Sequence, residues 1–163
     1  MKNIKIYRIM IVIFLAFIST NNLYTQIVVI VNSKNPVTSL TLEELERIYT
    51  ANVVRWESVN DGEEYITLSD YKNKSDVVER FFKTVTGLSH LKIRLEWIGK
   101  MLTGEIQHVP NKSATEKDVI EFIASNKGAI GFVNASMINE FPESVKVLKI
   151  NEKNYTESDY PLR

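Results

Sequence analysis

The chain has 163 residues, and its 20 Lys and Arg residues balance its 20 Asp and Glu residues, so the formal net charge at neutral pH is zero. Without a basic stripe, the sequence argues against nucleic acid as a partner, because such binding rests on clustered Lys and Arg. The chain also lacks cysteine, which excludes both disulfide stapling and a lipid anchor attached through a cysteine.

The N-terminus has the layout of a secretory signal peptide. Lys2, Lys5 and Arg8 form a basic start, and a run of ten apolar residues follows. A membrane-spanning helix needs about 20 such residues, so an uncleaved anchor is the weaker alternative. We therefore expect a cleaved signal peptide over 1–26 and a periplasmic or secreted domain over 27–163. Removal of the signal leaves 17 basic residues (20 minus three) against 20 acidic ones, a net charge near −3.

The first part of the domain predicts a strand, a helix and a second strand. The run 27–31 is continuously β-branched, which is typical of a strand buried on both faces. Thr41 with Glu44 forms a capping box at a helix start, and apolar residues recur on one face as far as Tyr49. A second strand is predicted over 65–68.

Two further helices follow in the middle of the chain. Ser75 and Ser89 are the predicted N-caps, and Gly87 and Gly104 are the predicted ends. Apolar residues form a stripe along the second of these helices: Leu91, Leu95, Ile98 and Leu102.

The last part predicts a helix over 115–125, a buried strand over 128–133 and an edge or half-exposed strand over 145–150. The polar tail, 151–163, is expected to be loosely held. Strands that alternate with helices predict a three-layer α/β domain with a mostly parallel or mixed sheet.

Four segments, each common by itself, are specific as an ordered set. They are 27–45 together with Ile48, Tyr49 and Trp56, then 127–133, 145–148 and 160–162. In this order they resemble the phosphate-type solute-binding proteins that supply bacterial ABC transporters. The resemblance covers essentially all of 27–163. It implies an α/β fold similar to type II periplasmic binding proteins, here one three-layer lobe whose mixed sheet is flanked by helices.

Full-length members of that family clamp the anion between two lobes, and this chain is similar only to the second lobe with its flanking crossovers. The 137 residues of the predicted domain cannot build two lobes that each have a core. A clamp that closes on a hinge is therefore not expected within one molecule, because closure needs two bodies.

The resemblance also implies where a solute would bind. The family's second lobe offers a Ser-Gly-Thr turn at a helix start, usually with an Arg and an Asp just before it, where backbone amides hold oxyanions. The matching stretch is 70–76, in which Ser75 is near the right place and Lys72 or Lys74 could replace the Arg. The loop over 32–39 is expected to flank it. The candidate ligand-binding residues are Ser39, Asp70, Lys72, Lys74 and Ser75.

Two departures from the family pattern weaken this site. The stretch has no glycine that would let the backbone wrap closely around an anion. Asp76 also puts a negative charge where the anion would sit. The alternative interpretation is that Ser75 is an ordinary cap and that both lysines are solvated.

The residues give no sign of catalysis, a cofactor or a metal. His90 and His108 are the only histidines, and neither has metal-ligand spacing with the other or with nearby acids. Both are expected to be exposed, and any Ser-His-Asp triad would have to use one of them. We therefore expect a protein that is not an enzyme and has no cofactor or metal. Trp56 and Trp97 are expected in the core.

These observations favour a solute-binding module for phosphate or a related oxyanion that serves ABC-type uptake with a membrane transporter as partner. The alternative is an interaction protein without solute binding, whose former cleft face docks a partner or a second copy of the chain. A homodimer or an exposed apolar patch on that face would favour the alternative.

Overall fold

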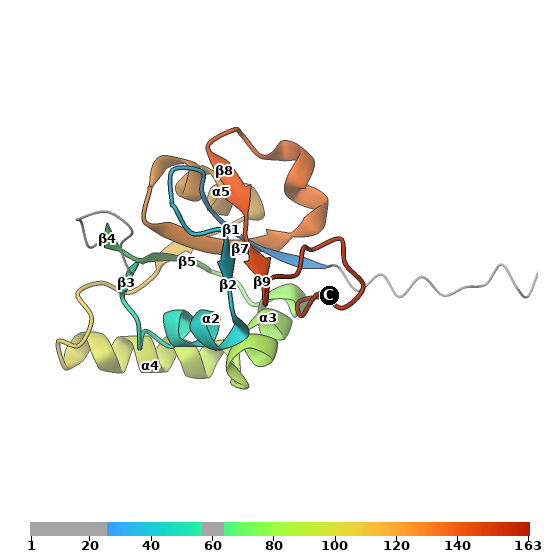
Figure 1. The fold of residues 1–163 in the computed structure, drawn as a ribbon. Coiled ribbons are helices and arrows are strands. Elements are labelled where there is room, and N and C mark those ends of the chain that lie inside the picture. Colours follow the sequence, from blue (N-terminus) through green and yellow to red (C-terminus); the bar gives the residue numbers. More distant parts are fainter. Residues whose placement is uncertain (1–25, 57–63) are drawn as a thin grey trace, which may run out of the picture.

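The computed structural model describes residues 26–56 and 64–163 (Figure 1). The predicted signal peptide lies outside the described residues, except for Gln26. Within the described part of the chain, no helix combines the length and the apolar character that crossing a bilayer would require.

A five-stranded mixed sheet forms the middle of the molecule, with the strand order β6-β5-β7-β1-β8. β5 runs parallel to β6 and β7, whereas β1 runs antiparallel to β7 and β8. The strands are β1 (Ile27–Asn32), β5 (Thr67–Tyr71), β6 (Asn111–Ser113), β7 (Ala129–Asn134) and β8 (Val145–Val147). The mixed sheet confirms the predicted fold class.

Two small sheets accompany the central one. β2 (Ser39–Leu40) pairs in parallel with β9 (Lys149–Ile150), and β3 (Arg55–Trp56) pairs antiparallel with β4 (Glu64–Tyr65). The predicted strand over 145–150 is thus divided between the two sheets, because β8 pairs with β1 and β9 pairs with β2.

Helices cover both faces of the central sheet, which gives the predicted three layers. Figure 1 shows α5 on one side of the sheet and α2, α3 and α4 on the other. The helices are α2 (Leu42–Tyr49), α3 (Asp76–Thr86), α4 (His90–Leu102) and α5 (Glu116–Ser125), with a 3-10 helix, η1 (Ala135–Glu140), after β7.

The predicted helix ends are confirmed where a local motif defines them. Thr41 and Glu44 form the capping box of α2, and Ser75 and Ser89 cap α3 and α4. Gly87 ends α3 in the left-handed conformation, with φ of 70°, which glycine adopts without steric cost.

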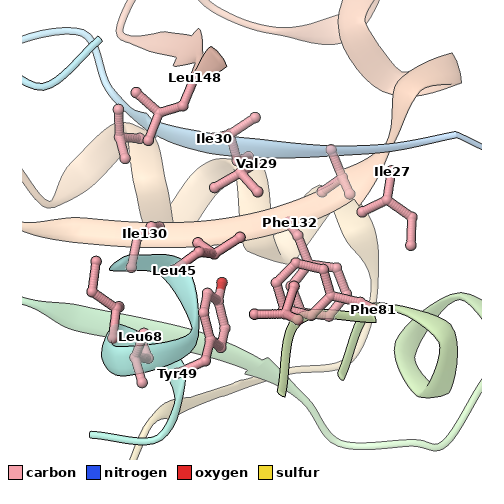
Figure 2. Close-up of a cluster of buried hydrophobic side chains, with 14 of the residues drawn as sticks. Ile27, Val29, Ile30, Leu45, Tyr49, Leu68, Phe81, Ile130, Phe132 and Leu148 are labelled. Atoms are coloured by element: carbon pink, nitrogen blue, oxygen red, sulfur yellow. The ribbon is translucent and has the colours of Figure 1, made fainter. Parts of the chain in front are cut away.

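The core combines aliphatic and aromatic side chains (Figure 2). Phe132 of β7 stacks on Phe81 of α3 with 3.7 Å between ring centroids, and Tyr49 of α2 meets Phe81 edge-on at 4.8 Å. Trp56 and Trp97 are buried, as expected. On the opposite face of β7, Gly131 lets α5 pack closely, because a Cβ there would lie only 2.8 Å from Cγ1 of Val119.

The C-terminal tail is held, so the expectation of a loose tail is wrong. Tyr160 and Leu162 are each only 3% exposed, and the backbone N–H of Ile27 donates to the carbonyl of Leu162 at 3.0 Å. Because the tail is mostly polar, its composition did not indicate that these two residues pack beside the start of β1.

Candidate functional site

Three parallel strands bring their carboxyl ends to one edge of the sheet, which we call the carboxyl edge. β5 leads there into α3 through residues 72–75, and β6 leads into α5 through residues 114–115. The backbone N–H of Lys72 donates to the carbonyl of Ser113 at 2.8 Å, which ties the two strand ends together. In open α/β sheets, ligands commonly bind in the crevice outside these strand ends.

At this edge the structure gathers three of the predicted site residues in the stretch before α3. Ser75 caps the helix, and its Oγ accepts a hydrogen bond from the N–H of Val78 at 3.3 Å. Lys72 and Lys74 precede it with exposed side chains. The Nζ of Lys74 lies 3.5 Å from Oε1 of Glu79, an exposed ion pair of the kind that contributes little stability.

At the start of α5, the side chain of Asp118, a residue of the helix itself, accepts backbone hydrogen bonds. Oδ2 of Asp118 accepts the backbone N–H groups of Thr115 at 3.0 Å and Ala114 at 2.9 Å. These hydrogen bonds lower the pKa of the Asp118 carboxyl, and the positive charge of Lys72 lowers it further. Lys72 therefore lies near the negative charge of Asp118.

Asp70 lies inside the protein rather than at the edge. It belongs to β5 and is fully buried, with His90 Nε2 2.6 Å from its Oδ1 and the Nζ of Lys112 bonded to its Oδ2. Asp70 thus links β5, β6 and the start of α4, and its carboxylate is enclosed by these two partners.

His90 is buried, so the expectation that it is exposed is wrong. His90 is only 3% exposed, and its ring stacks on that of Phe82 with 4.7 Å between centroids. The sequence showed only that His90 follows a helix cap, because its two partners, Asp70 and Phe82, come from β5 and α3. His108 is exposed, as expected.

The strand pairing indicates that Ser39 does not lie beside Lys72 and Lys74 at the carboxyl edge. The register pairs Ile27 with Asn134 and Val31 with Ile130, so β1 ends at the edge opposite the carboxyl edge. The loop over 32–39 begins at that opposite edge. Its first residue, Asn32, donates to the carbonyls of Ile123 and Ala124 at the C-terminal end of α5, and Ser39 then pairs with Lys149.

The structure also shows a cavity that sequence reasoning missed. It has a volume of about 340 Å³ and lies near the amino ends of β5 and β6, with Thr67, Leu68 and Pro110 in its wall. Tyr65 provides a polar centre, because its hydroxyl accepts from Nη2 of Arg55 at 2.5 Å and from Nε2 of Gln107 at 3.3 Å. Gln107 is far from Arg55 and Tyr65 in the sequence, so no spacing pattern could have indicated the cavity.

Among residues 26–56 and 64–163, no cluster of His, Asp and Glu side chains is arranged to hold a metal ion. The carboxyl edge instead offers two lysine side chains, a hydroxyl and a helix start, which together can attract an anion by charge and hydrogen bonding.

The comparison with known protein families agrees with this architecture. The model of the PBP superfamily domain matches residues 17–162. The chain belongs to this family. No curated protein sequence matches it significantly.

The chain is similar in fold to several solved structures that are described as phosphate-transport or phosphate-binding proteins. The chain is similar to an ABC-type phosphate transport receptor from Vibrio cholerae, with 21% identity and a TM-score of 0.60 over 80% of this chain and 48% of the other. It is also similar to a putative phosphate ABC transporter substrate-binding protein from Clostridium perfringens with bound phosphate, with 21% identity and a TM-score of 0.63 over 80% and 47% of the two chains. PstS from Borrelia burgdorferi matches with 14% identity and a TM-score of 0.62 over 79% and 48%.

These matches confirm the predicted resemblance at the level of the fold. The PBP domain of this chain spans about half the length of the structures it matches. What the chain shares with these structures is thus the fold, over about half of their length.

Proposed function

We propose that this chain is a solute-binding module that holds phosphate or a related oxyanion at Lys72, Lys74 and Ser75, outside the cytoplasm. In this proposal it serves ABC-type phosphate uptake, and its protein partner is a membrane transporter. The observation that carries the proposal is the position of two exposed lysines directly before the start of α3, at the carboxyl edge of a phosphate-binding-protein-like sheet.

The physical basis is electrostatic. The start of an α-helix carries partial positive charge and free backbone N–H groups, so it attracts an oxyanion. α3 has 11 residues, enough for two full turns behind such a site. Lys72 and Lys74 add full charges, whereas Asp76 and Asp118 oppose them. Because the site is open on one side, its hydrogen bonds compete with water and binding is expected to be weak.

Asp70 and Ser39 have indirect roles in this proposal. Asp70 holds β5, β6 and the start of α4 together beneath the edge, through Lys112 and His90. Ser39 belongs to the pair of short strands β2 and β9 and does not contact the anion.

Thermal unfolding with and without ligand tests the proposal. A ligand at ten times its Kd stabilises the native state by about 1.4 kcal/mol, which raises the Tm of a domain of this size by about 5 °C. We expect millimolar phosphate to raise the Tm more than potassium chloride at the same ionic strength. The double substitution Lys72→Ala and Lys74→Ala should abolish the difference.

Lys149→Ala is the matched control, because Lys149 is an exposed lysine on β9 rather than at the carboxyl edge. It should leave the phosphate effect intact. A wild-type protein without a phosphate-specific shift, or a double variant that keeps the shift, would contradict the proposed site.

A further inference from the structure

Helix α4 is apolar on two opposite faces. Its inner face packs His90, Ile93 and Trp97 into the core. Its outer face carries four large apolar residues that are between 44% and 78% exposed, and we call them the outer stripe: Leu91, Leu95, Ile98 and Leu102. The predicted apolar stripe of this helix therefore faces solvent in the described structure.

An exposed apolar stripe of this kind indicates that another surface covers it. Single exposed apolar residues are normal, but a contiguous apolar face on a protein surface marks an interaction site. Figure 1 shows α4 along the outer side of the molecule, with α2 and α3 on its inner side and no described segment beyond it.

The spacing of the outer stripe fits a second helix. Its members are separated by four, three and four residues, which is the heptad spacing with which two helices interlock their side chains. The pattern is also symmetric. If two copies of α4 lie antiparallel, Leu91 of one copy meets Leu102 of the other, and Leu95 meets Ile98. Such self-complementarity is what a two-fold symmetric dimer requires.

The charges beside the stripe favour the same arrangement. Lys92 and Arg94 flank its N-terminal half, whereas uncharged Gly99 and Met101 flank its C-terminal half. In an antiparallel pair each basic half lies against an uncharged half, and it approaches the partly negative C-terminal end of the other helix and Glu105 beyond it. A parallel pair would instead place the same lysine and arginine at the same level on both helices.

Gly99 is consistent with close approach of another helix. Glycine in a helix interior costs helix stability relative to alanine. A Cβ at Gly99 would meet no atom within 4 Å, so packing within the described structure gives no reason for glycine there. Next to Ile98, it leaves room for the backbone of a neighbouring helix.

We propose that two copies of this chain associate through α4, antiparallel about a two-fold axis, with the outer stripe at the centre of the interface. Stable interfaces bury about 800 Å² per partner, with an apolar centre and a polar rim. Here the stripe forms the centre, and Lys92, Arg94 and Glu105 form part of the rim. The docking surface is thus an outer helix face and not the carboxyl edge.

Sedimentation equilibrium of protein obtained from the full 163-residue chain tests the dimer. The wild type should be dimeric, and Leu95→Glu should weaken association at least about thirtyfold, because it puts a charge at the centre of the interface. Leu95 is exposed in the single copy, so the far-ultraviolet circular dichroism should not change. Asn139→Glu adds the same charge to the exposed surface of η1 and should leave the dimer intact.

Disulfide cross-linking through introduced cysteines tests the orientation of the two α4 helices. The chain has no cysteine of its own that could form other cross-links. Leu91→Cys and Leu102→Cys, carried by copies with different tags, should form a mixed disulfide when combined, and Leu91→Cys alone should not cross-link. A cross-link by Leu91→Cys alone, or a dimer that survives Leu95→Glu, would overturn the proposal. A wild type that stays monomeric at about 100 µM would overturn it as well. A monomer that binds phosphatidylglycerol vesicles through the stripe would show that a membrane, not a second copy, covers α4.

Discussion

Asp70 shows how a single buried carboxylate can join three elements. Its two oxygens engage His90 at the start of α4 and Lys112 in β6, and no part of Asp70 is exposed. Removing one partner of such a buried charged group leaves the others without compensation, which costs far more than losing an ion pair on the surface. The residue therefore matters for stability and only indirectly for the site above it.

We expect Asp70→Asn to lower the free energy of unfolding by about 3 kcal/mol, the typical loss when one member of a buried ion pair is removed. Urea denaturation followed by circular dichroism would measure this loss. Asp159→Asn is the matched control, because Asp159 pairs with Lys153 on the surface and should barely change the midpoint. If the two variants unfold at the same urea concentration, Asp70 is not the internal link that the geometry indicates.

The pKa of Asp118 reports on the charge at the carboxyl edge. Its carboxyl is held below its usual pKa by the N–H groups of Thr115 and Ala114 and by Lys72. A carboxyl whose pKa is lower in the folded state than in the unfolded state stabilises the fold at pH values above its pKa in the unfolded state. That contribution is lost as the pH falls through the lowered pKa.

Asp118→Asn should therefore lower the Tm at pH 7, and the difference from the wild type should shrink below about pH 4, the ordinary range of an Asp pKa. Lys72→Ala should move the Asp118 pKa upward, as measured by carboxyl-carbon NMR during a pH titration. A Tm difference that is constant down to pH 2, the acid end of such a titration, would contradict the assigned capping role.

At the scale of elements, β7 and α5 pack closely at Gly131. A Cβ at position 131 would lie 2.8 Å from Cγ1 of Val119 and 3.4 Å from Cβ of Ser69. Both neighbours lie in the packed interior, so they have little room to move. Glycine is required here by the approach of the helix and not by the backbone conformation of the strand.

Gly131→Ala should reduce the free energy of unfolding by about 1–3 kcal/mol, the usual cost of overpacking. Val119→Ala removes the obstructing methyl group, so the two substitutions together should cost less than the sum of their separate effects. Chemical denaturation of the four proteins in this cycle provides the measurement. Additive losses would show that the clash with Val119 is not the cause.

The elements that the sequence predicts well are those defined by neighbouring residues. The capping box of Thr41 and Glu44 and the caps at Ser75 and Ser89 act within one helical turn, so the pattern alone reveals them. The predicted second strand stopped at 68, whereas β5 continues to Tyr71. Ser69 and Asp70 look like loop residues until β6 and α4 supply Ser113, Lys112 and His90 as partners.

Properties that depend on residues distant in the sequence could not be predicted from the sequence. The periodicity of α4 identified its apolar stripe but not the direction in which the stripe points, because the inner face carries Ile93 and Trp97 as well. The sequence identifies Ser75 correctly as the cap of α3, but the pairing register that sends the loop over 32–39 to the opposite edge is a tertiary property.

For the whole molecule, the proposed oxyanion site is formed by residues of a single PBP domain. The PBP domain spans about half the length of the structures it matches, and Lys72, Lys74 and Ser75 are exposed in the described part of the chain. A hinge that closes over the anion would need a second body. The account therefore combines weak oxyanion capture at the carboxyl edge with a separate contact between copies along α4, and the two proposals can fail independently, because they share no residue.

A phosphate titration followed by ¹H–¹⁵N NMR tests the central claim most directly. Our account predicts saturable shifts of the amides over 72–77, absent with chloride at the same ionic strength and absent in the Lys72→Ala, Lys74→Ala double variant. Shifts that cluster instead around Arg55, Tyr65 and Gln107 at the cavity, or no saturable shifts at all, would contradict it.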